Sequence, residues 1–239
     1  MKRVSSYRQI EELANLRLAE YEMKTGRKLN LPTPIDELIE DVYGLKILWE
    51  EIDEQPGETI LGGLSTKEKI IVLNEKHRDL FRQKSGLERS TKGHEVGHWD
   101  LFSPKDETEL NFATEAESVF CYRSSSSTLL EVVLNSWTDD SSYTAYRELT
   151  KNCDEPHVKS AVDYYASCLS MPRDLLLKTA SNYNLFDWKS LYRFAHDVDV
   201  TISALVVRLQ QLSLIYVAPN KKIFKSQDQF QGQKSFLFQ

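Results

Sequence analysis

The chain has few of the residues and patterns that mark several common protein classes. Its 239 residues include three cysteines, Cys121, Cys153 and Cys168, an odd number without a closely spaced pair. Such a set excludes a disulfide framework and a paired-cysteine zinc knuckle, so we expect a reducing, cytoplasmic environment. No apolar run approaches the roughly 20 residues of a membrane-spanning helix. No apolar stretch follows the basic N-terminal residues either, so we expect no secretory signal.

An excess of positive charge is also missing. The chain has 30 Lys and Arg against 36 Asp and Glu, a net charge of −6, which argues against a surface built for nucleic acid. A hydrophobic content of 41% with 28% charged residues is ordinary for a globular protein with one large or two small domains.

Apolar periodicity predicts an α+β protein in which helices dominate. Helical periods cover residues 10–24, 34–43, 77–83, 87–102, 158–169 and 173–181, and two runs between 194 and 214 divide near 199–201 like a helix–turn–helix. Strand-like runs at 45–50, 59–65 and 70–74 predict a small three-stranded antiparallel sheet. Residues 103–157 form an acidic, loop-rich insertion that includes the loop Ser124–Ser127, and residues 221–239 form a frayed tail.

The stretch His94-Glu95-Val96-Gly97-His98 has the pattern H-E-x-x-H. Residues four apart lie on one face of a helix, so both imidazoles can reach the same Zn²⁺ ion. Glu95 then lies beside the metal without ligating it, where a general base belongs. Gly93 and Gly97 interrupt the same helix at a cost of about 1 kcal/mol each relative to Ala, which predicts that another element approaches its backbone closely.

Several motifs in this order resemble the ImmA/IrrE family of zinc metallopeptidases. They are Pro-Ile-Asp-Glu-Leu-Ile from residue 34, Ile-Leu-Gly-Gly-Leu from residue 60, Ile-Ile-Val-Leu-Asn from residue 70, Gly-His-Glu-Val-Gly-His-Trp from residue 93, and Tyr-Tyr-Ala-Ser-Cys-Leu-Ser-Met-Pro from residue 164. Two looser matches are Cys-Tyr-Arg-Ser-Ser from residue 121 and Val-x-x-x-Ala-x-x-x-Arg-Leu from residue 200. The resemblance covers residues from about 10 to about 217.

The resemblance implies a gluzincin-like zincin core in residues 1–180, with helix–turn–helix-like helices in residues 181–239. It also implies a Zn²⁺ cofactor held by His94 and His98, with Glu95 as catalytic base. The activity it implies is cleavage of a partner protein, a helix–turn–helix repressor, which regulates transcription in a stress response.

The sequence departs from the family pattern at the third zinc ligand. Aligning the helix that ends in Met-Pro places Lys159 where the family has a Glu, and an ammonium group cannot ligate zinc. Asp163, one turn further on, is the candidate that we favour, with Glu155 and His157 as rivals. The insertion offers Glu115 and Glu117 as well.

Three alternatives follow from the same residues. Because two histidines without a carboxylate would bind zinc weakly, the chain is alternatively a degenerate zincin that binds a repressor or toxin without cutting it. Tyr164 and Tyr165 have the chemistry of oxyanion donors, although core packing explains them better. Direct DNA binding by the C-terminal helices is disfavoured, since Asp197 and Asp199 would oppose phosphate. The sequence leaves the oligomeric state open.

Overall fold

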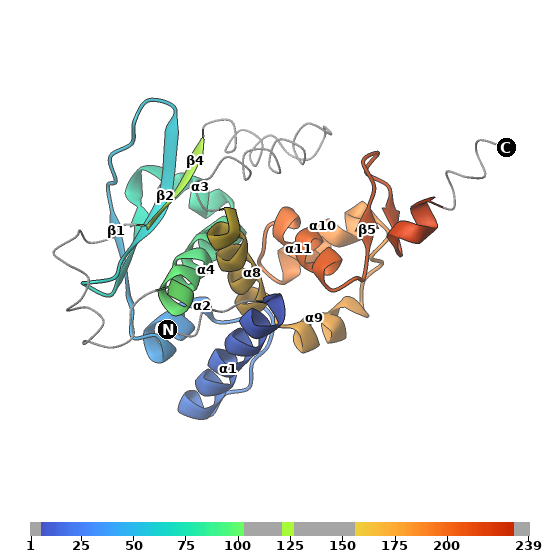
Figure 1. Cartoon of the computed structure of the whole chain (residues 1–239), viewed down its shortest axis with the longest axis horizontal. Helices are drawn as coiled ribbons and strands as arrows, with labels where there is room; N and C mark the ends of the chain where they lie inside the picture. Colours follow the sequence, from blue (N-terminus) through green and yellow to red (C-terminus); the bar gives the residue numbers. More distant parts are fainter. Residues whose placement is uncertain (1–5, 103–120, 127–155, 232–239) are drawn as a thin grey trace.

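A computed structural model describes residues 6–102, 121–126 and 156–231, and Figure 1 shows the arrangement of their elements. The larger helices are α1 (Tyr7–Thr25), α4 (Ser85–Phe102), α8 (Pro156–Ser170), α9 (Arg173–Ala180), α10 (Trp188–Asp197) and α11 (Ile202–Gln211). The strands are β1 (Lys46–Glu50), β2 (Glu58–Ser65), β3 (Ile70–Asn74), β4 (Cys121–Ser126), β5 (Tyr216–Val217) and β6 (Ile223–Phe224). The mixed α+β class that the sequence predicts is confirmed. Within these residues, no helix is long and apolar enough to cross a membrane.

The N-terminal helices begin and end where the local sequence predicts. In α1, the Ser6 side chain accepts a hydrogen bond from the Gln9 amide, and Gly26 ends the helix at φ +69° with its N–H on the Glu22 carbonyl. The predicted helix over 34–43 consists of α2 (Ile35–Glu37), which continues into a π-helical segment, η1 (Leu38–Val42). A short 3₁₀ turn, η2 (Glu75–His77), then leads into α3 (Arg78–Gln83).

The main sheet differs from the prediction in strand number and direction. Its strand order is β1-β3-β2-β4. Strand β2 pairs antiparallel with β3 and β4, but β1 runs parallel to β3. The prediction of three antiparallel strands is therefore wrong. Residues 51–57 let the chain pass over β3, and Asn74 fixes this crossing by bonding the Ile52 and Ile60 carbonyls at 3.3 and 2.8 Å.

Strand β4 contradicts another expectation, because its residues reach Ser126 and include most of the predicted loop Ser124–Ser127. It pairs with β2 from Glu58↔Ser126 to Leu64↔Cys121, with an irregularity between Ile60 and Gly63. Serine-rich composition suggested a loop, but the exposed pairing edge of β2 provides main-chain hydrogen bonds that need no particular side chain. The other residues of the predicted insertion up to 155 lie outside the described part of the chain.

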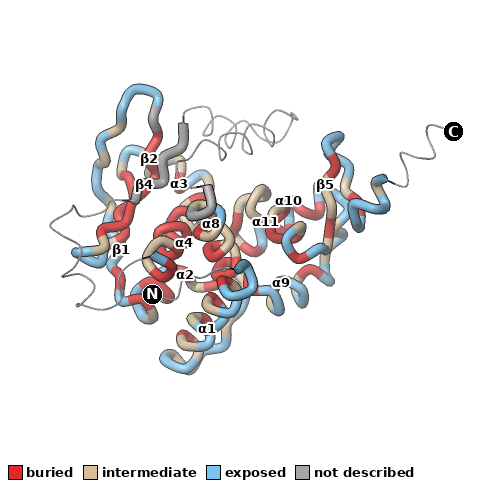
Figure 2. Tube along the Cα trace, viewed as in Figure 1, coloured by how far each residue is buried: buried red, intermediate tan, exposed pale blue. Residues whose placement is uncertain are grey.

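Helices α4 and α8 lie between the sheet and the C-terminal helices (Figure 1). They share one hydrophobic core with α1 and the sheet, to which Tyr21, Leu64, Val96 and Val162 contribute. Figure 2 shows that most of α4 is buried, whereas α1 and α9 expose one side to solvent. The helix that carries the H-E-x-x-H pattern is thus the central element of the fold.

A second hydrophobic core begins at Met171 and joins α9, α10 and α11. The division between α10 and α11 falls where the sequence predicts it, although α10 begins at Trp188, after an Asp187 cap, rather than near Phe194. The prediction of a frayed tail from residue 221 is wrong for the described part, because β5 and β6 pair. Trp188 Nε1 donates to the Lys221 carbonyl at 2.8 Å and Phe230 packs on Phe224, which together hold this segment in place.

Candidate metal centre on helix α4

Helix α4 buries the residues of the H-E-x-x-H pattern. His94 is 4% exposed and Glu95 is 0% exposed, although both are polar. Burying a carboxylate or an imidazole costs free energy that only a specific role or specific partners offset. Glu95 lies three residues before His98 and therefore shares a helix face with it. The buried face of α4 is thus polar at its centre.

The two glycines of α4 let α8 approach it closely, as the sequence predicts. A Cβ atom built on Gly97 would lie 2.9 Å from Val162 Cγ1 and 3.1 Å from the Val162 carbonyl oxygen. On Gly93 it would lie 3.3 Å from the Cβ of Ala166. Both pairs are four residues apart on their helices, so the contact follows one ridge of each helix. Asp163 follows Val162 directly and is thereby brought beside His94.

Asp163 contacts the Nδ1 atom of His94. Its Oδ1 lies 2.8 Å from that nitrogen. An ionised carboxylate only accepts hydrogen bonds, so His94 Nδ1 carries a proton and donates it to Asp163. When the ring is neutral, this tautomer leaves the lone pair on Nε2. Asp163, our favoured third ligand, therefore contacts the edge of the ring opposite to the nitrogen that faces His98.

The two histidines face each other through their Nε2 atoms, which are 3.2 Å apart. Burial, with a smaller contribution from His94, lowers the pKa of His98 to about 4, so this ring is neutral at pH 7. Two nitrogen ligands at about 2.0–2.1 Å from a tetrahedral zinc ion would lie about 3.3–3.4 Å apart. The spacing of the two Nε2 atoms and the neutral His98 ring fit two positions of a zinc site.

A third ligand is not evident within the described ranges. No group of three His, Cys, Asp or Glu side chains among residues 6–102, 121–126 and 156–231 is arranged to hold a metal ion. Of the predicted rivals, Glu155, Glu115 and Glu117 lie outside these ranges, and His157 is in the first turn of α8, where only the backbone is described. Lys159 lies one turn before Asp163 on that helix.

Just beyond the histidine pair, a buried polar network fixes the end of α4. The Arg17 guanidinium donates to both oxygens of Asp100 at 2.9 and 2.8 Å, and the Tyr165 hydroxyl donates to the same carboxylate at 2.6 Å. Tyr43 and Tyr165 share a further hydroxyl hydrogen bond of 2.7 Å. Sequence reasoning missed this network, because the spacing of Arg17, Tyr43 and Asp100 carries no signal.

The two neighbouring tyrosines of α8, Tyr164 and Tyr165, have different hydrogen-bond partners. Tyr165 is fully buried and bonded within the core, which agrees with the packing interpretation. Tyr164 packs against Tyr7 at a ring distance of 4.7 Å and donates to Glu11 at 3.3 Å. Both hydroxyls are thus engaged in contacts between α8 and its neighbours.

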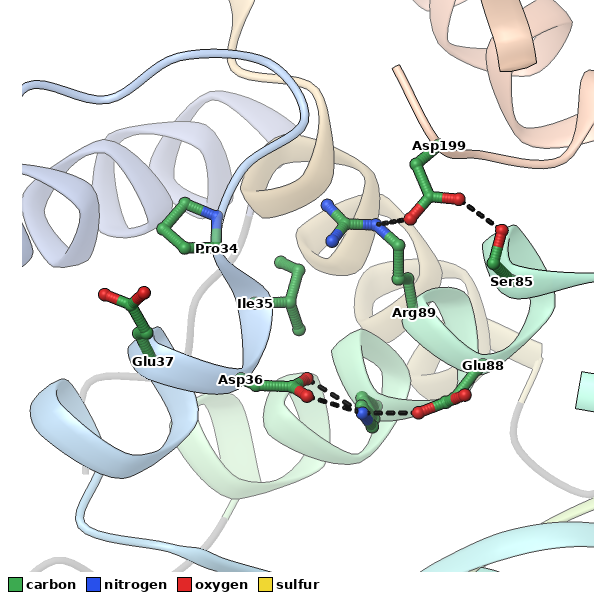
Figure 3. Close-up of a pocket in the computed structure, with 9 residues that line it drawn as sticks. Pro34, Ile35, Asp36, Glu37, Ser85, Glu88, Arg89 and Asp199 are labelled. Atoms are coloured by element: carbon green, nitrogen blue, oxygen red, sulfur yellow. Dashed lines mark hydrogen bonds and ion pairs between the residues drawn. The ribbon is translucent and has the colours of Figure 1, made fainter. Parts of the chain in front are cut away.

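A charged cavity of about 290 Å³ lies at the N-terminal end of α4 (Figure 3). Its lining residues are Pro34, Ile35, Asp36, Glu37, Ser85, Glu88, Arg89, Lys92 and Asp199. Lys92 is 4% exposed; its Nζ lies 2.8 Å from Asp36 and 2.6 Å from Glu88. Arg89 reaches Asp199 at 3.5 Å. The pair with Asp36 joins α4 to α2, and the pair with Asp199 joins α4 to the turn before α11. None of the predicted site residues lines the cavity.

Comparison with known proteins adds nothing to this geometry: no family model matches the chain, and no curated protein is significantly similar to it.

Proposed function

We propose that this chain is a zinc-dependent endopeptidase of the ImmA/IrrE type, in which His94 and His98 are two of the zinc ligands. The observation that carries the proposal is the 3.2 Å separation of the two Nε2 atoms, with the His98 ring neutral. Two histidines placed on a helix face by chance would usually be exposed to solvent, whereas His94 and His98 are largely buried. The zincin-like character of the core formed by the sheet, α4 and α8 belongs to the same proposal.

Asp163 supports the pair by fixing the tautomer of His94. Carboxylates that accept the second N–H of a ligating histidine orient the ring and raise its basicity. The 2.8 Å contact to Nδ1 has this geometry. Whether the same carboxylate also ligates zinc, as the sequence suggested, is decided by the experiment below, together with the rivals Glu155 and His157.

Glu95 is the residue that we assign to proton transfer. Bound zinc would lower the pKa of a water molecule toward about 7 and stabilise the negative charge that develops on the peptide carbonyl. Glu95 would accept the proton of the attacking water and pass it to the leaving amine.

The substrate that we propose is a partner protein, a helix–turn–helix repressor, whose cleavage would regulate transcription in a stress response within the cytoplasm. This part rests on the resemblance of the motifs to the family. The pair α10 and α11 has helix–turn–helix-like spacing, and we assign it to contact with that partner rather than with DNA. The acidic Asp197 and Asp199 at its turn support this choice.

A non-cutting regulator on the same fold is the second candidate. It is favoured by a specific observation, namely that Lys159 lies one turn before Asp163, where the family has a ligating Glu. The described residues also contain no complete three-ligand group. A chain of this kind would bind its repressor or toxin partner without hydrolysing it.

Zinc stoichiometry tests the proposal first. The wild-type chain should bind about one zinc ion, and His98→Ala should lose it, whereas His196→Ala should not, because His196 is an exposed histidine far from the pair in sequence. Comparing Asp163→Ala, Glu155→Ala and His157→Ala then identifies the third ligand. Absence of zinc from the wild-type chain in excess metal would exclude the zinc endopeptidase.

Proteolysis separates the two candidates once zinc is established. A library of peptides from a digested proteome, incubated with the zinc-loaded chain, should yield new termini that mass spectrometry detects. Glu95→Gln should abolish these termini while zinc stays bound. Zinc binding without any Glu95-dependent cleavage would favour the non-cutting regulator.

A further inference from the structure

Strand β1 is an edge strand of the main sheet, and only one of its two sides pairs with another described strand. In the strand order β1-β3-β2-β4, it pairs with β3, and no other strand of the described residues pairs with its outer side. An edge strand of this kind exposes a row of main-chain donors and acceptors, which is a template for pairing with another chain.

The parallel ladder determines which main-chain groups face outward. The Lys46 amide donates to the Lys69 carbonyl at 3.0 Å, so the N–H and C=O of Lys46 point toward β3. Successive residues of a strand point their main-chain groups in opposite directions. The N–H and C=O groups of Ile47 and Trp49 therefore face the open edge.

The side chains of β1 divide into two kinds. Ile47 packs against the hydrophobic core, and Trp49 makes an edge contact with Phe81 at a ring distance of 5.5 Å. Lys46, Leu48 and Glu50 are exposed on the other face, and Leu48 keeps 39% of its surface accessible. On this face the lysine and the glutamate each lie two residues from the leucine. When the strand is paired antiparallel with a second copy of itself about this leucine, each lysine therefore lies opposite a glutamate.

We propose that β1 pairs with β1 of a second copy of this chain, antiparallel and centred on Leu48, to form a symmetric dimer with a continuous sheet. In this register Ile47 is opposite Trp49 of the second copy, and their outward main-chain groups form about four hydrogen bonds. Lys46 is opposite Glu50 at both ends of the seam, and the two Leu48 side chains meet at its centre. A two-fold axis through Leu48 satisfies the requirement that the same patch serves both copies.

Other symmetric registers fit less well. Centring the seam on Ile47 places Lys46 opposite Leu48, and centring it on Trp49 places Leu48 opposite Glu50. Both put a charged group against an apolar one and leave Lys46 and Glu50 unmatched. Only the register centred on Leu48 overlaps all five residues of β1 and pairs both charges.

The proposed seam and helix α4, which carries the candidate metal centre, lie toward different edges of the sheet. Strand β1 is one edge of the sheet and β4 is the other. Helix α4 contacts β4 and its neighbour β2, and to a lesser extent β3. Pairing through β1 therefore covers neither β4 nor α4. The dimer would form whether or not the chain binds zinc.

Charge reversal on the full-length chain tests the seam, with dimer dissociation measured by analytical ultracentrifugation. The wild type should dimerise reversibly, and Lys46→Glu or Glu50→Lys alone should each raise the dissociation constant about tenfold, because each creates two like-charge pairs. The double variant Lys46→Glu/Glu50→Lys should return to within about threefold of wild type, since the pairs are restored with reversed sign. Lys67→Glu and Glu68→Lys, exposed in the turn between β2 and β3, are the matched controls and should change nothing.

A cross-link tests the register independently of affinity. In a background in which Cys121 and Cys153 are serine, Leu48→Cys should form an intermolecular disulfide on mild oxidation, because directly opposed strand residues lie within disulfide reach. Lys46→Cys in the same background should not cross-link efficiently, since position 46 faces position 50. A monomeric wild type at all micromolar concentrations would overturn the proposal. So would a dimer that neither responds to single charge reversals nor cross-links at position 48.

Discussion

The contact between Gly97 of α4 and Val162 of α8 makes a demanding test of how the candidate site is built. In Gly97→Ala, the new Cβ would lie 2.9 Å from Val162 Cγ1 and 3.1 Å from the Val162 carbonyl oxygen, where ordinary contacts begin at 3.4 Å. The shortfalls are 0.5 and 0.3 Å, so α8 has to move away from α4. Asp163, the next residue of α8, would move with it and lengthen its 2.8 Å contact with His94.

The expected effects on stability and on zinc binding differ in size. Overpacking of a close helix contact costs about 1–3 kcal/mol, and replacing a helical Gly by Ala returns about 1 kcal/mol. The free energy of unfolding of the Gly97→Ala chain should therefore fall by only about 0–2 kcal/mol. Zinc affinity should fall about 10–100-fold, because the carboxylate that orients His94 is displaced.

Urea unfolding and zinc competition with a chromogenic chelator measure the two quantities. Gly93→Ala is the matched control, since its Cβ would lie 3.3 Å from the Cβ of Ala166, a shortfall of only 0.1 Å, and its stability and zinc affinity should stay at or above wild type. Adding Val162→Ala to Gly97→Ala should recover part of the zinc affinity, a coupling between two residues in contact. Equal zinc affinities of Gly97→Ala and Gly93→Ala would refute the argument that the close approach positions Asp163.

Three further predictions concern the partner of His94, two buried tyrosines and the partner of a buried arginine. Asp163→Asn, which keeps the side-chain volume, should weaken zinc binding about 10–100-fold, and an unchanged affinity would remove Asp163 from the site. Burial raises the pKa of Tyr43 and of Tyr165 well above the usual value of about 10, so unfolding releases their protons in alkali and the free energy of unfolding should fall as pH rises above about 10. Replacing both by Phe should flatten that decline in urea titrations, and an equally steep decline would contradict the assignment. Glu11→Ala should destabilise the fold by about 3 kcal/mol, because it removes the carboxylate that pairs at 2.7 Å with the fully buried Arg208 guanidinium. A loss below about 1 kcal/mol, the level of an exposed ion pair, would contradict this.

Local sequence was sufficient for most of the helices and for the position of the histidine pair. Helical periods located α1, α4, α8 and the division between α10 and α11 within a few residues, because capping groups, glycines and apolar spacing act over one or two turns. The H-E-x-x-H spacing placed His94 and His98 on one face in the same way, and Gly97 indicated a close neighbour without naming it.

Only the tertiary structure decided what lies against those helices. Main-chain hydrogen bonds between separate segments determine the direction of β1, the pairing of β4 with β2 and the β5–β6 hairpin. Side-chain periodicity carries no information about these bonds. The contact of Asp163 with Nδ1 of His94 and the network around Asp100 likewise join residues from separate helices. The sequence alone therefore identified the residues whose side-chain types suit a metal site. The packing of α8 on α4 determined how deeply these side chains are buried and which partners they contact, since both depend on residues far apart in the chain.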